Sequence, residues 1–292
     1  MAWIADLILA GSLPRHWAPG GWWFNSKRRI FRRAMMRGRT RPVYVGDRTV
    51  LCTVLGRYKM YVDSGDLSLS PHLMMDGWWE MWVTEAMAAL VRPGAIAVDV
   101  GANLGYFTLV MAELCGERGH VHAFEPSPRV AGLLNRSVEV NGYSARVTHH
   151  HAPLGDVEGR RLHLVVPGRQ EGGAHLVEEG SLGGRSSIVV ETRRLDAVPG
   201  GRDAEIVKID AEGSEEAIWR GMARMIAGTR LHTVLLEFAA ERHPDPVGFL
   251  AELSGAGFSL GYVHESRGIV TTTAGELLKD SSRADRMLVL RR

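Results

Sequence analysis

The chain is poor in cysteine, and this scarcity limits the kinds of site that it can form. Its 292 residues include only Cys52 and Cys115. Two cysteines are too few for a disulfide framework, so we expect a reducing compartment. The sequence also has no C-x-x-C or H-E-x-x-H motif, and it therefore indicates no zinc site.

Long apolar runs and a strong net charge are also missing. The first 13 residues are apolar, but Asp6 interrupts them, no basic region precedes them, and they are shorter than the roughly 20 residues of a membrane span. We expect an amphipathic helix here and a cytoplasmic protein. The net charge of +2 is too small to indicate a nucleic-acid partner.

One segment has no charge of negative sign. Residues 27–41 contain eight lysines and arginines and no acid. This pattern is typical either of a solvated basic arm or of a contact with an anionic partner, such as a membrane surface or an acidic substrate. The overall composition, 45% hydrophobic and 23% charged, is that of a globular protein.

The distribution of tryptophan divides the chain. Seven of the eight tryptophans precede residue 83, and after Pro93-Gly94 the residue pattern changes to short apolar runs that alternate with helical segments. We predict an irregular, tryptophan-rich subdomain over residues 1–92, with an N-terminal helix, a short β pair within 49–63 and a helix over 78–91. Its aromatic residues would form the subdomain's own core, a homodimer contact, or a pocket that stacks on sugar rings.

Residues 93–292 alternate between short apolar runs and helical patterns. The runs are "AIAVDV", "HVHAFE", "ARVTHH", "EIVKID", "TVLLEF", "FSLGYV" and "RMLVLR", and the helical segments are 105–115, 128–141, 214–227 and 246–256. Apolar strands separated by helices predict a doubly wound α/β domain with a mostly parallel sheet. No convincing helix separates the last two runs, so we expect them to form an antiparallel hairpin at the sheet edge.

An insertion over residues 157–195 interrupts this alternation. It contains two strand-like runs joined by a glycine-rich segment, which predicts a β-hairpin extension. Its tip would either close over a site or remain a surface loop.

The first strand ends in "DVGANLGYFT", residues 99–108. Gly101 and Gly105 permit a tight turn and the close approach of a ligand. Their G-x-x-x-G spacing differs from the G-x-G-x-x-G of a dinucleotide site, which argues against a nicotinamide-dependent oxidoreductase. Asp99 and Asn103 offer groups that suit a ligand with an ammonium and a carboxylate, such as an amino acid.

The second strand ends at Glu125, 26 residues after Asp99 (125 − 99). An acid at this strand end is placed to accept hydrogen bonds from both hydroxyls of a ribose. An amino-acid group at one strand end and a ribose at the next together describe S-adenosylmethionine.

At this point the sequence resembles the FkbM family of S-adenosylmethionine-dependent O-methyltransferases, over roughly residues 60–292. The segments that carry the resemblance are "YVDSGDLSLSPHLMMDGWWE", "VDVGANLGYFT", "FEPSP", "HAPLGD", "TRRLDAV", "IVKIDAEGSEEAIWRGM" and "LLEF". The resemblance implies a Rossmann-like class I methyltransferase fold and transfer of a methyl group to a hydroxyl, often on a sugar or secondary metabolite.

The donor site that we expect combines the two strand ends with their neighbours. The resemblance implies contacts from Asp99, Gly101, Asn103, Gly105 and Glu125. The full set of predicted cofactor-binding residues adds Ala102, Phe107, Thr108, Pro126, Ser127 and Asp156, with either His151 or Asp156 near the adenine.

The fourth strand ends in "KIDAEG", where the two-residue period of a strand would place Lys208, Asp210 and Glu212 on one side. In this fold that strand end faces the transferable methyl group. Asp210 is the first candidate to orient the acceptor hydroxyl or to remove its proton. Help would come either from Mg²⁺ held by Asp210, Glu212 and Glu237, or from His243 or His264.

Structural roles compete with each of these assignments. Glu212 and Glu215 would equally cap the following helix, Lys208 would pair with an acid, and both histidines would be structural. A non-catalytic module that binds S-adenosylmethionine is the alternative function, ahead of the oxidoreductase. The expected partner is a small hydroxylated acceptor.

Overall fold

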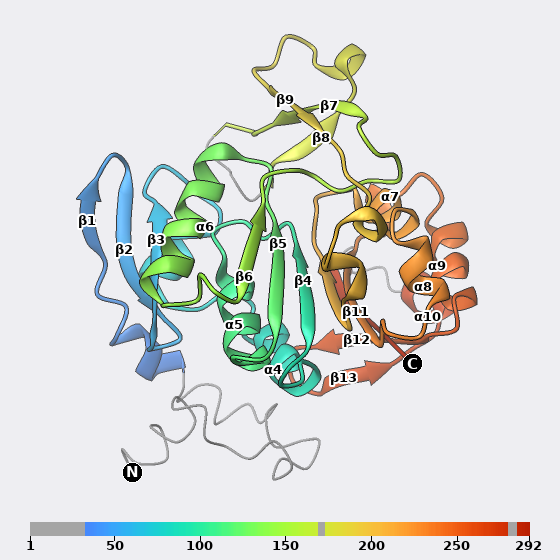
Figure 1. Ribbon diagram of the computed structural model, residues 1–292, viewed down its shortest axis with the longest axis horizontal. Coiled ribbons are helices and arrows are strands. Elements are labelled where there is room, and N and C mark those ends of the chain that lie inside the picture. Colours follow the sequence, from blue (N-terminus) through green and yellow to red (C-terminus); the bar gives the residue numbers. More distant parts are fainter. Residues whose placement is uncertain (1–32, 169–172, 280–284) are drawn as a thin grey trace.

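The computed structural model describes residues 33–168, 173–279 and 285–292 (Figure 1). The helix expected over the first 13 residues and much of the basic segment lie outside the described residues. In the described part, no helix is both long and apolar enough to cross a membrane.

The central sheet is the doubly wound, mostly parallel sheet that the sequence predicts. Its strands are β4 (Ile96–Val100), β5 (His120–Phe124), β6 (Val147–His150), β10 (Ile206–Ile209), β11 (Thr233–Phe238), β12 (Ser259–His264), β13 (Gly268–Thr271) and β14 (Arg286–Arg291). They lie in the order β13-β12-β14-β11-β10-β4-β5-β6. The five strands from β11 to β6 are parallel to their neighbours, whereas β14 is antiparallel to both β11 and β12.

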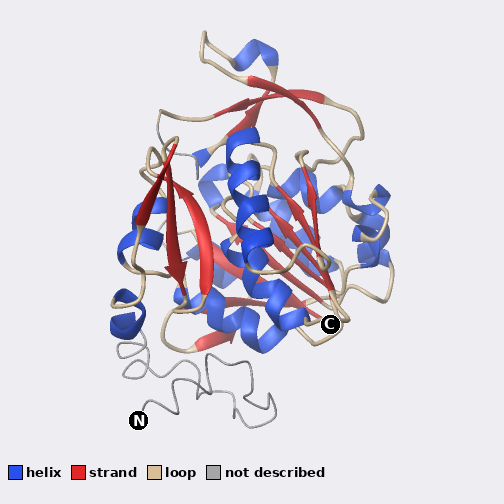
Figure 2. Cartoon of the chain, turned by 60° about the vertical axis from the view of Figure 1, so that its left-hand side comes forward, coloured by secondary structure: helices blue, strands red, loops and turns tan. Residues whose placement is uncertain are grey.

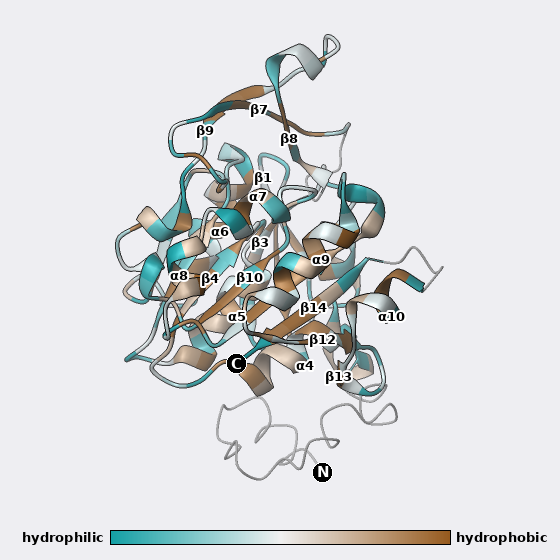
Figure 3. Ribbon diagram, turned by 90° about the vertical axis from the view of Figure 1, so that its right-hand side faces the viewer, coloured by the Kyte–Doolittle hydropathy of each residue, from teal (hydrophilic) through white to brown (hydrophobic). Residues whose placement is uncertain are grey.

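Successive apolar residues of the central strands β4, β10, β11 and β14 belong to two different cores, one on each face of the sheet. Ala97 packs in one core with Met111, and its neighbour Val98 packs in the other with Trp219. The first face is covered by α4 (Met81–Leu90), α5 (Tyr106–Cys115) and α6 (Pro128–Val140), and the second by α7 (Glu215–Arg220), α8 (Ala223–Ala227) and α9 (Pro246–Gly255). Figure 2 shows helices on both sides of the strands, and Figure 3 shows hydrophobic residues along them. Covered faces explain the continuous apolar strands.

The helix predicted over 214–227 is instead two short helices. The break falls at Gly221, where a Cβ atom would lie 2.0 Å from the carbonyl oxygen of Gly155. The close approach of another backbone segment therefore falls where the helical pattern is interrupted. The other three helices predicted for this domain match α5, α6 and α9 within about a residue at each end.

The predicted hairpin at the sheet edge is wrong in its connection. The runs "FSLGYV" and "RMLVLR" do lie side by side and antiparallel, as β12 and β14. However, β13 pairs with the outer side of β12 and forms the edge, and α10 (Ala274–Lys279) precedes β14. The side chains of β14 enter both cores, Met287 and Val289 on one face and Leu288 and Leu290 on the other. A strand that is apolar on both faces is stabilised inside the sheet rather than at its edge.

The segment before β4 adds a second sheet. The predicted pair is present as β2 (Thr49–Val54) and β3 (Tyr58–Asp63), and β1 (Val43–Gly46) extends it. A helix that was not predicted, α3 (Ser70–Met75), follows. Residues Cys52 and Met60 of this sheet pack in the same core as α5 and α6. The boundary near residue 92 stays a prediction.

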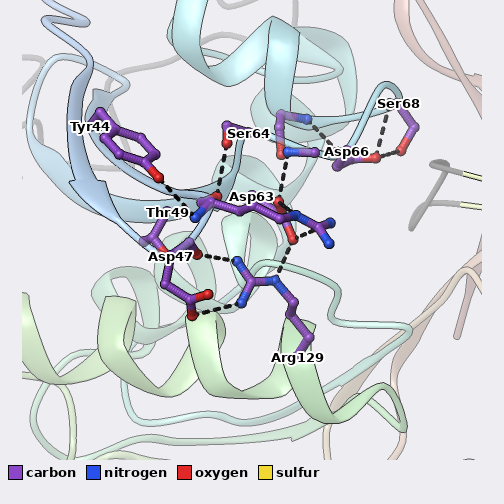
Figure 4. Close-up of polar contacts among 11 residues, drawn as sticks. Tyr44, Asp47, Thr49, Asp63, Ser64, Asp66, Ser68 and Arg129 are labelled. Atoms are coloured by element: carbon purple, nitrogen blue, oxygen red, sulfur yellow. Dashed lines mark hydrogen bonds and ion pairs between the residues drawn. The ribbon is translucent and has the colours of Figure 1, made fainter.

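Polar contacts also join this sheet to α6 (Figure 4). Arg129, at the start of α6, donates hydrogen bonds to the carboxylate of Asp63 and to the backbone carbonyl of Asp47. Arg48 donates to the same Asp63 carboxylate, at 3.0 Å from its Oδ2. The guanidinium groups therefore tie a segment distant in sequence to the helix that follows Glu125.

The insertion forms a third sheet rather than a simple hairpin. The two predicted strands pair as β7 (Arg161–Val165) and β9 (Ile188–Glu191), and their connection contributes β8 (His175–Val177). Figure 1 shows this sheet beyond one end of the central strands. At its base, the N–H of Gly155 donates to the carbonyl of Arg193, and the N–H of Arg193 donates to the carbonyl of Pro153.

Candidate functional site

A cavity of about 350 Å³ lies at the carboxyl ends of β4, β5, β10 and β11. Its walls come from the loops after these strands and after β6, the segment before α4, the start of α5 and α7, and the extension between β7 and β8. The lining residues are Ser68, Leu69, Trp79, Glu80, Val100, Gly101, Ala102, Asn103, Tyr106, Phe107, Phe124, Glu125, Pro126, Ala152, Pro153, Leu154, Leu164, Gly173, Ala174, His175, Leu176, Lys208, Asp210, Ala211, Glu212, Ser214, Ile218 and Glu237. The strand order reverses at β4, which is where ligands bind in open α/β sheets.

The turn after β4 requires glycine at its first position. Gly101 has a φ of +70°, and a Cβ atom there would lie 1.8 Å from the carbonyl oxygen of Asp210. The N–H groups of Gly101 and Ala102 both donate to the carbonyl of Phe124, at 3.1 and 3.0 Å. The ends of three adjacent strands are thereby held in backbone contact, and this contact shapes the floor of the cavity.

Glu125 joins the first two strand ends. Its Oε2 accepts a hydrogen bond from the N–H of Asn103 at 3.0 Å, and its Oε1 accepts one from the N–H of Ser127 at 2.8 Å. The side chain is buried yet lines the cavity. Each carboxylate oxygen can accept a further hydrogen bond. The arrangement therefore fits a ribose whose hydroxyls donate to Glu125.

Asp99 lies behind the cavity wall rather than on it. The residue is completely buried, and its Oδ2 accepts a hydrogen bond from the hydroxyl of Thr108 at 2.6 Å. Its Oδ1 lies 3.9 Å from Nζ of Lys208. Burial raises the pKa of Asp99, and the nearby lysine opposes this effect. Asp99 and Thr108 therefore support the glycine turn from within the core.

Lys208 is a buried cation that links two strand ends. It lies directly opposite Asp99 in the pairing of β10 with β4, and its Nζ donates to Oδ2 of Asp210 at 3.0 Å. Burial alone would lower the pKa of Lys208, but Asp210 and Asp99 together raise it to about 12. The lysine therefore stays protonated and is unsuited to act as a base. Its contact instead fixes the carboxylate of Asp210 at the cavity wall.

Glu212 and Glu237 reach the same wall by different routes. Strand β10 ends at Ile209, so strand alternation does not extend to Glu212, and a turn with a φ of +50° brings this residue to the cavity. Burial raises the pKa of Glu212 to about 7, although Arg242 opposes the shift. Burial and the charge of Asp210 raise the pKa of Glu237 well above its ordinary value.

The side chain of Arg242 occupies the position where the magnesium hypothesis requires a metal. Its Nη1 lies 2.6 Å from Oε2 of Glu237 and 3.3 Å from Oε2 of Glu212. Among the residues described, no group of three or more His, Cys, Asp or Glu side chains could hold a metal ion. The Mg²⁺ expectation is therefore not supported.

Of the remaining predicted residues, Phe107 and Pro126 line the cavity, whereas the others do not reach its wall. His243 is buried between the rings of Phe238 and Phe249, and His264 lies at the end of β12. Asp156 binds through its backbone carbonyl to Arg194, while its neighbours at positions 152–154 line the cavity. Gly105 and Ser127 are the N-caps of α5 and α6. Glu215, the first residue of α7, accepts from the N–H groups of Ala211 and Gly213, which precede the helix, so its side chain orders the turn after β10 rather than capping the helix as expected.

Sequence reasoning assigned no role to Glu80, which lines the cavity from the segment before α4. This residue has a φ of +33° and is the N-cap of α4. Glu80, Asn103 and Glu212 are non-glycine residues with positive φ, and all three line the cavity. Backbone strain of this kind concentrates at functional sites. The predicted helix over 78–91 includes Glu80, whereas α4 begins only at Met81, so the acid that ends "DGWWE" is the N-cap and not part of the helix.

Comparison with protein families gives one match that covers more than half of the chain. The Methyltransferase FkbM domain matches residues 99–260. This range begins at Asp99 and includes the strand ends that carry Glu125, Asp210 and Glu237. The segment that carries Trp79 and Glu80 lies outside it.

Curated relatives match shorter parts of the chain. The tRNA wybutosine-synthesizing protein 2 homolog of Danio rerio is 36% identical over 84 residues, 27% of this chain and 20% of its own length. The protein-L-isoaspartate O-methyltransferase of Hyperthermus butylicus is 37% identical over 65 residues, 20% of this chain and 27% of its own. This chain thus spans well under two thirds of the length of these relatives.

Solved structures with a similar fold share little sequence. Precorrin-6y C5,15-methyltransferase from Geobacter metallireducens is 14% identical, with a TM-score of 0.42 over 79% of this chain and 96% of that one. Pyrococcus horikoshii TYW2 in complex with MeSAdo is 11% identical, with a TM-score of 0.43 over 99% and 98% of the two chains. Likeness at this level does not bear on what the chain acts on.

Proposed function

Because the chain belongs to the FkbM methyltransferase family, we propose that it transfers a methyl group from S-adenosylmethionine to a hydroxyl of a small acceptor. The acceptor class that we propose is a sugar, a glycoside or another secondary metabolite. The observation that best supports this proposal is a single cavity that contains both the turn joined to Glu125 and the pair formed by Lys208 and Asp210.

The residues at the first two strand ends fit the donor. Glu125 would accept hydrogen bonds from the ribose, and the apolar side chains of Phe124, Pro126 and Leu154 would contact the adenine. When bound, S-adenosylmethionine supplies a methyl group on a positively charged sulfur, which is already activated for displacement. The protein must then position the acceptor oxygen and remove its proton.

Asp210 is the residue that we propose for this second task. Its side chain is partly exposed on the cavity wall, and Lys208 holds one of its oxygens. The other oxygen is available to accept the hydroxyl hydrogen bond and to take the proton as the new C–O bond forms. Glu212 and Glu237 place two further acids on the same wall, bound to Arg242.

Other residues that line the cavity support an acceptor site that is both aromatic and polar. Trp79 contributes an aromatic ring, and Leu164 and Leu176 of the extension contribute apolar side chains. An aromatic ring beside polar groups suits the alternating apolar and hydroxylated faces of a sugar. The names of the relatives refer to tRNA and protein substrates, but their matches cover only 27% and 20% of this chain, so they do not indicate those acceptors here.

Isothermal titration with S-adenosylmethionine tests the donor, and formation of S-adenosylhomocysteine with a panel of hydroxylated compounds tests the acceptor. We expect Asp210→Asn to keep donor affinity within about threefold and to lower kcat by about 10²- to 10⁴-fold. Glu241→Gln, an exposed acid outside the cavity, is the control and should change neither. Failure of the folded wild-type protein to bind the donor would contradict the proposal.

A further inference from the structure

The positive charge at the methionine end of the donor needs a partner that the predicted site does not provide. Asp99 was the acid expected to bind this ammonium group. In the structure its carboxylate is completely buried and is bound to Thr108, with Lys208 on its other side. A group that lies behind the wall is not available to a ligand in the cavity.

Most other carboxylates of the cavity already have partners. Glu125 accepts two backbone N–H groups, and Asp210 accepts from Lys208. Glu212 and Glu237 share Arg242. Each of these acids is therefore at least partly neutralised or used in shaping the wall.

Glu80 differs from them. Within residues 33–168, 173–279 and 285–292, its carboxylate has no hydrogen bond or ion pair, although it lines the cavity. Tyr106, the first residue of α5 after the glycine turn, lines the same cavity, and its hydroxyl lies 3.0 Å from that of Thr84 in the first turn of α4, so the start of α4 lies beside the glycine turn. An acid with no partner, at the end of the cavity where the amino-acid part of the donor is expected, is suited to bind a cation.

The backbone of Glu80 is held firmly in place. The hydroxyl of Thr84 lies 3.3 Å from the carbonyl oxygens of both Trp79 and Glu80, and 3.0 Å from the hydroxyl of Tyr106. These contacts link the first turn of α4 to α5. They keep Glu80 in its left-handed conformation, with a φ of +33°. A strained residue that is fixed by its neighbours is typical of a binding site.

We propose that Glu80, and not Asp99, binds the α-ammonium group of S-adenosylmethionine. This inference rests on the proposed function, because it assigns a residue to the same donor. Burial, with a contribution from Asp210, raises the pKa of Glu80 to about 7. A bound ammonium group would favour the ionised carboxylate and so offset this effect.

The test compares two ligands that differ at the methionine end. S-adenosylhomocysteine carries the ammonium group, whereas 5′-methylthioadenosine lacks the amino-acid part. We expect Glu80→Gln to lower the affinity for S-adenosylhomocysteine by about 10- to 100-fold, as for a lost hydrogen bond between charged groups. The affinity for 5′-methylthioadenosine should change less than twofold. Titration calorimetry measures both affinities. Glu241→Gln, an exposed acid outside the cavity, is the control and should change neither affinity.

Other results would overturn the inference. Unchanged affinity of Glu80→Gln for S-adenosylhomocysteine would exclude the contact, and a large fall in kcat in the same variant would assign Glu80 to proton removal instead. Equal weakening of both ligands would indicate a general distortion of the cavity. If Glu80→Gln does not fold, Glu80→Gly serves in its place, since glycine tolerates the local φ. Failure of the wild-type protein to bind either ligand would contradict the proposed function itself.

Discussion

The two walls of the cavity use acidic side chains in opposite ways. At the ends of β4 and β5, Asp99 and Glu125 bond to groups of the protein and fix the shape of the turns. At the ends of β10 and β11, Asp210, Glu212 and Glu237 line the cavity and share two cations, Lys208 and Arg242. The role of an acid at a strand end therefore depends on its neighbours. On one wall the carboxylates hold the turns in place, and on the other they contribute negative charge to the cavity.

Lys208 contacts acids of both walls, so its replacement should cause the largest loss in the free energy of unfolding. Lys208→Met leaves the buried Asp99 without its cation and Asp210 without its hydrogen bond. We expect a loss of about 4 kcal/mol in the free energy of unfolding, measured by urea denaturation. Adding Asp99→Asn should recover part of the loss, because it removes the uncompensated charge. A loss below about 1 kcal/mol would show that the lysine does not couple the walls.

A substitution in the glycine turn after β4 should cause the next largest loss in the free energy of unfolding. Gly101→Ala introduces a Cβ atom 1.8 Å from the carbonyl oxygen of Asp210 at a φ of +70°. Strain and overlap together should cost about 3 kcal/mol. Gly142→Ala is the matched control, because Gly142, just after α6, has a φ of +73° but no atom within 4 Å of the added methyl, and it should cost about 1 kcal/mol. Equal losses in the two variants would mean that the backbone contact is unimportant.

The histidines beside the first wall predict a moderate dependence on pH. Nδ1 of His122 lies 3.0 Å from Nε2 of His150, whose ring stacks on Phe124. Burial, with smaller contributions from nearby cationic groups, lowers the pKa of both histidines to about 4. Below their ordinary pKa of about 6.5 the unfolded chain binds more protons than the folded one, so stability falls as pH decreases from about 6.5 to 4.

The size of that effect should be about 2 kcal/mol between pH 6.5 and 4.5, after allowance for partial exposure. Urea midpoints across this range measure it. The double variant His122→Gln/His150→Gln cannot titrate and should lose this part of the dependence. An unchanged slope in the double variant would assign the acid sensitivity to groups other than these two histidines.

Replacing Glu80 by glycine should give the smallest change and the opposite sign. Its φ of +33° strains a residue with a Cβ atom, and glycine removes that strain. We expect Glu80→Gly to raise the free energy of unfolding by up to about 1 kcal/mol in thermal or urea denaturation. A clear loss of stability would instead mean that the Glu80 side chain supports the fold.

The sheet could be predicted well from the sequence because its buried strands appear there as short apolar runs. The apolar runs of β4, β10 and β11 have side chains in both cores, and no other arrangement would cover them. The position of β13 escaped prediction because four residues carry too little pattern. The next strand along the chain, β14, was misplaced because an apolar run shows that a strand is buried, but not between which strands it lies.

The candidate site was only partly predictable, for a related reason. Strand ends identify which acids meet at the edge of a sheet, and Glu125, Asp210, Glu212 and Glu237 do line one cavity. Whether an acid faces the cavity or the core depends on contacts distant in sequence, such as those of Asp99. Glu80 lies on a segment outside the strand pattern, so no periodicity could bring it to the site.

The backbone contacts at the base of the extension allow the length of the inserted segment to vary. Residues on either side of the insertion, at positions 153–155 and at 193, are bonded to each other across its base. The stretch between them starts and finishes at one place, so a piece of different length can be grafted there at little entropic cost. Exchanging the β7–β9 extension between homologues would therefore be a direct way to test whether it determines the choice of acceptor, because the strand ends proposed to bind the donor would be unchanged.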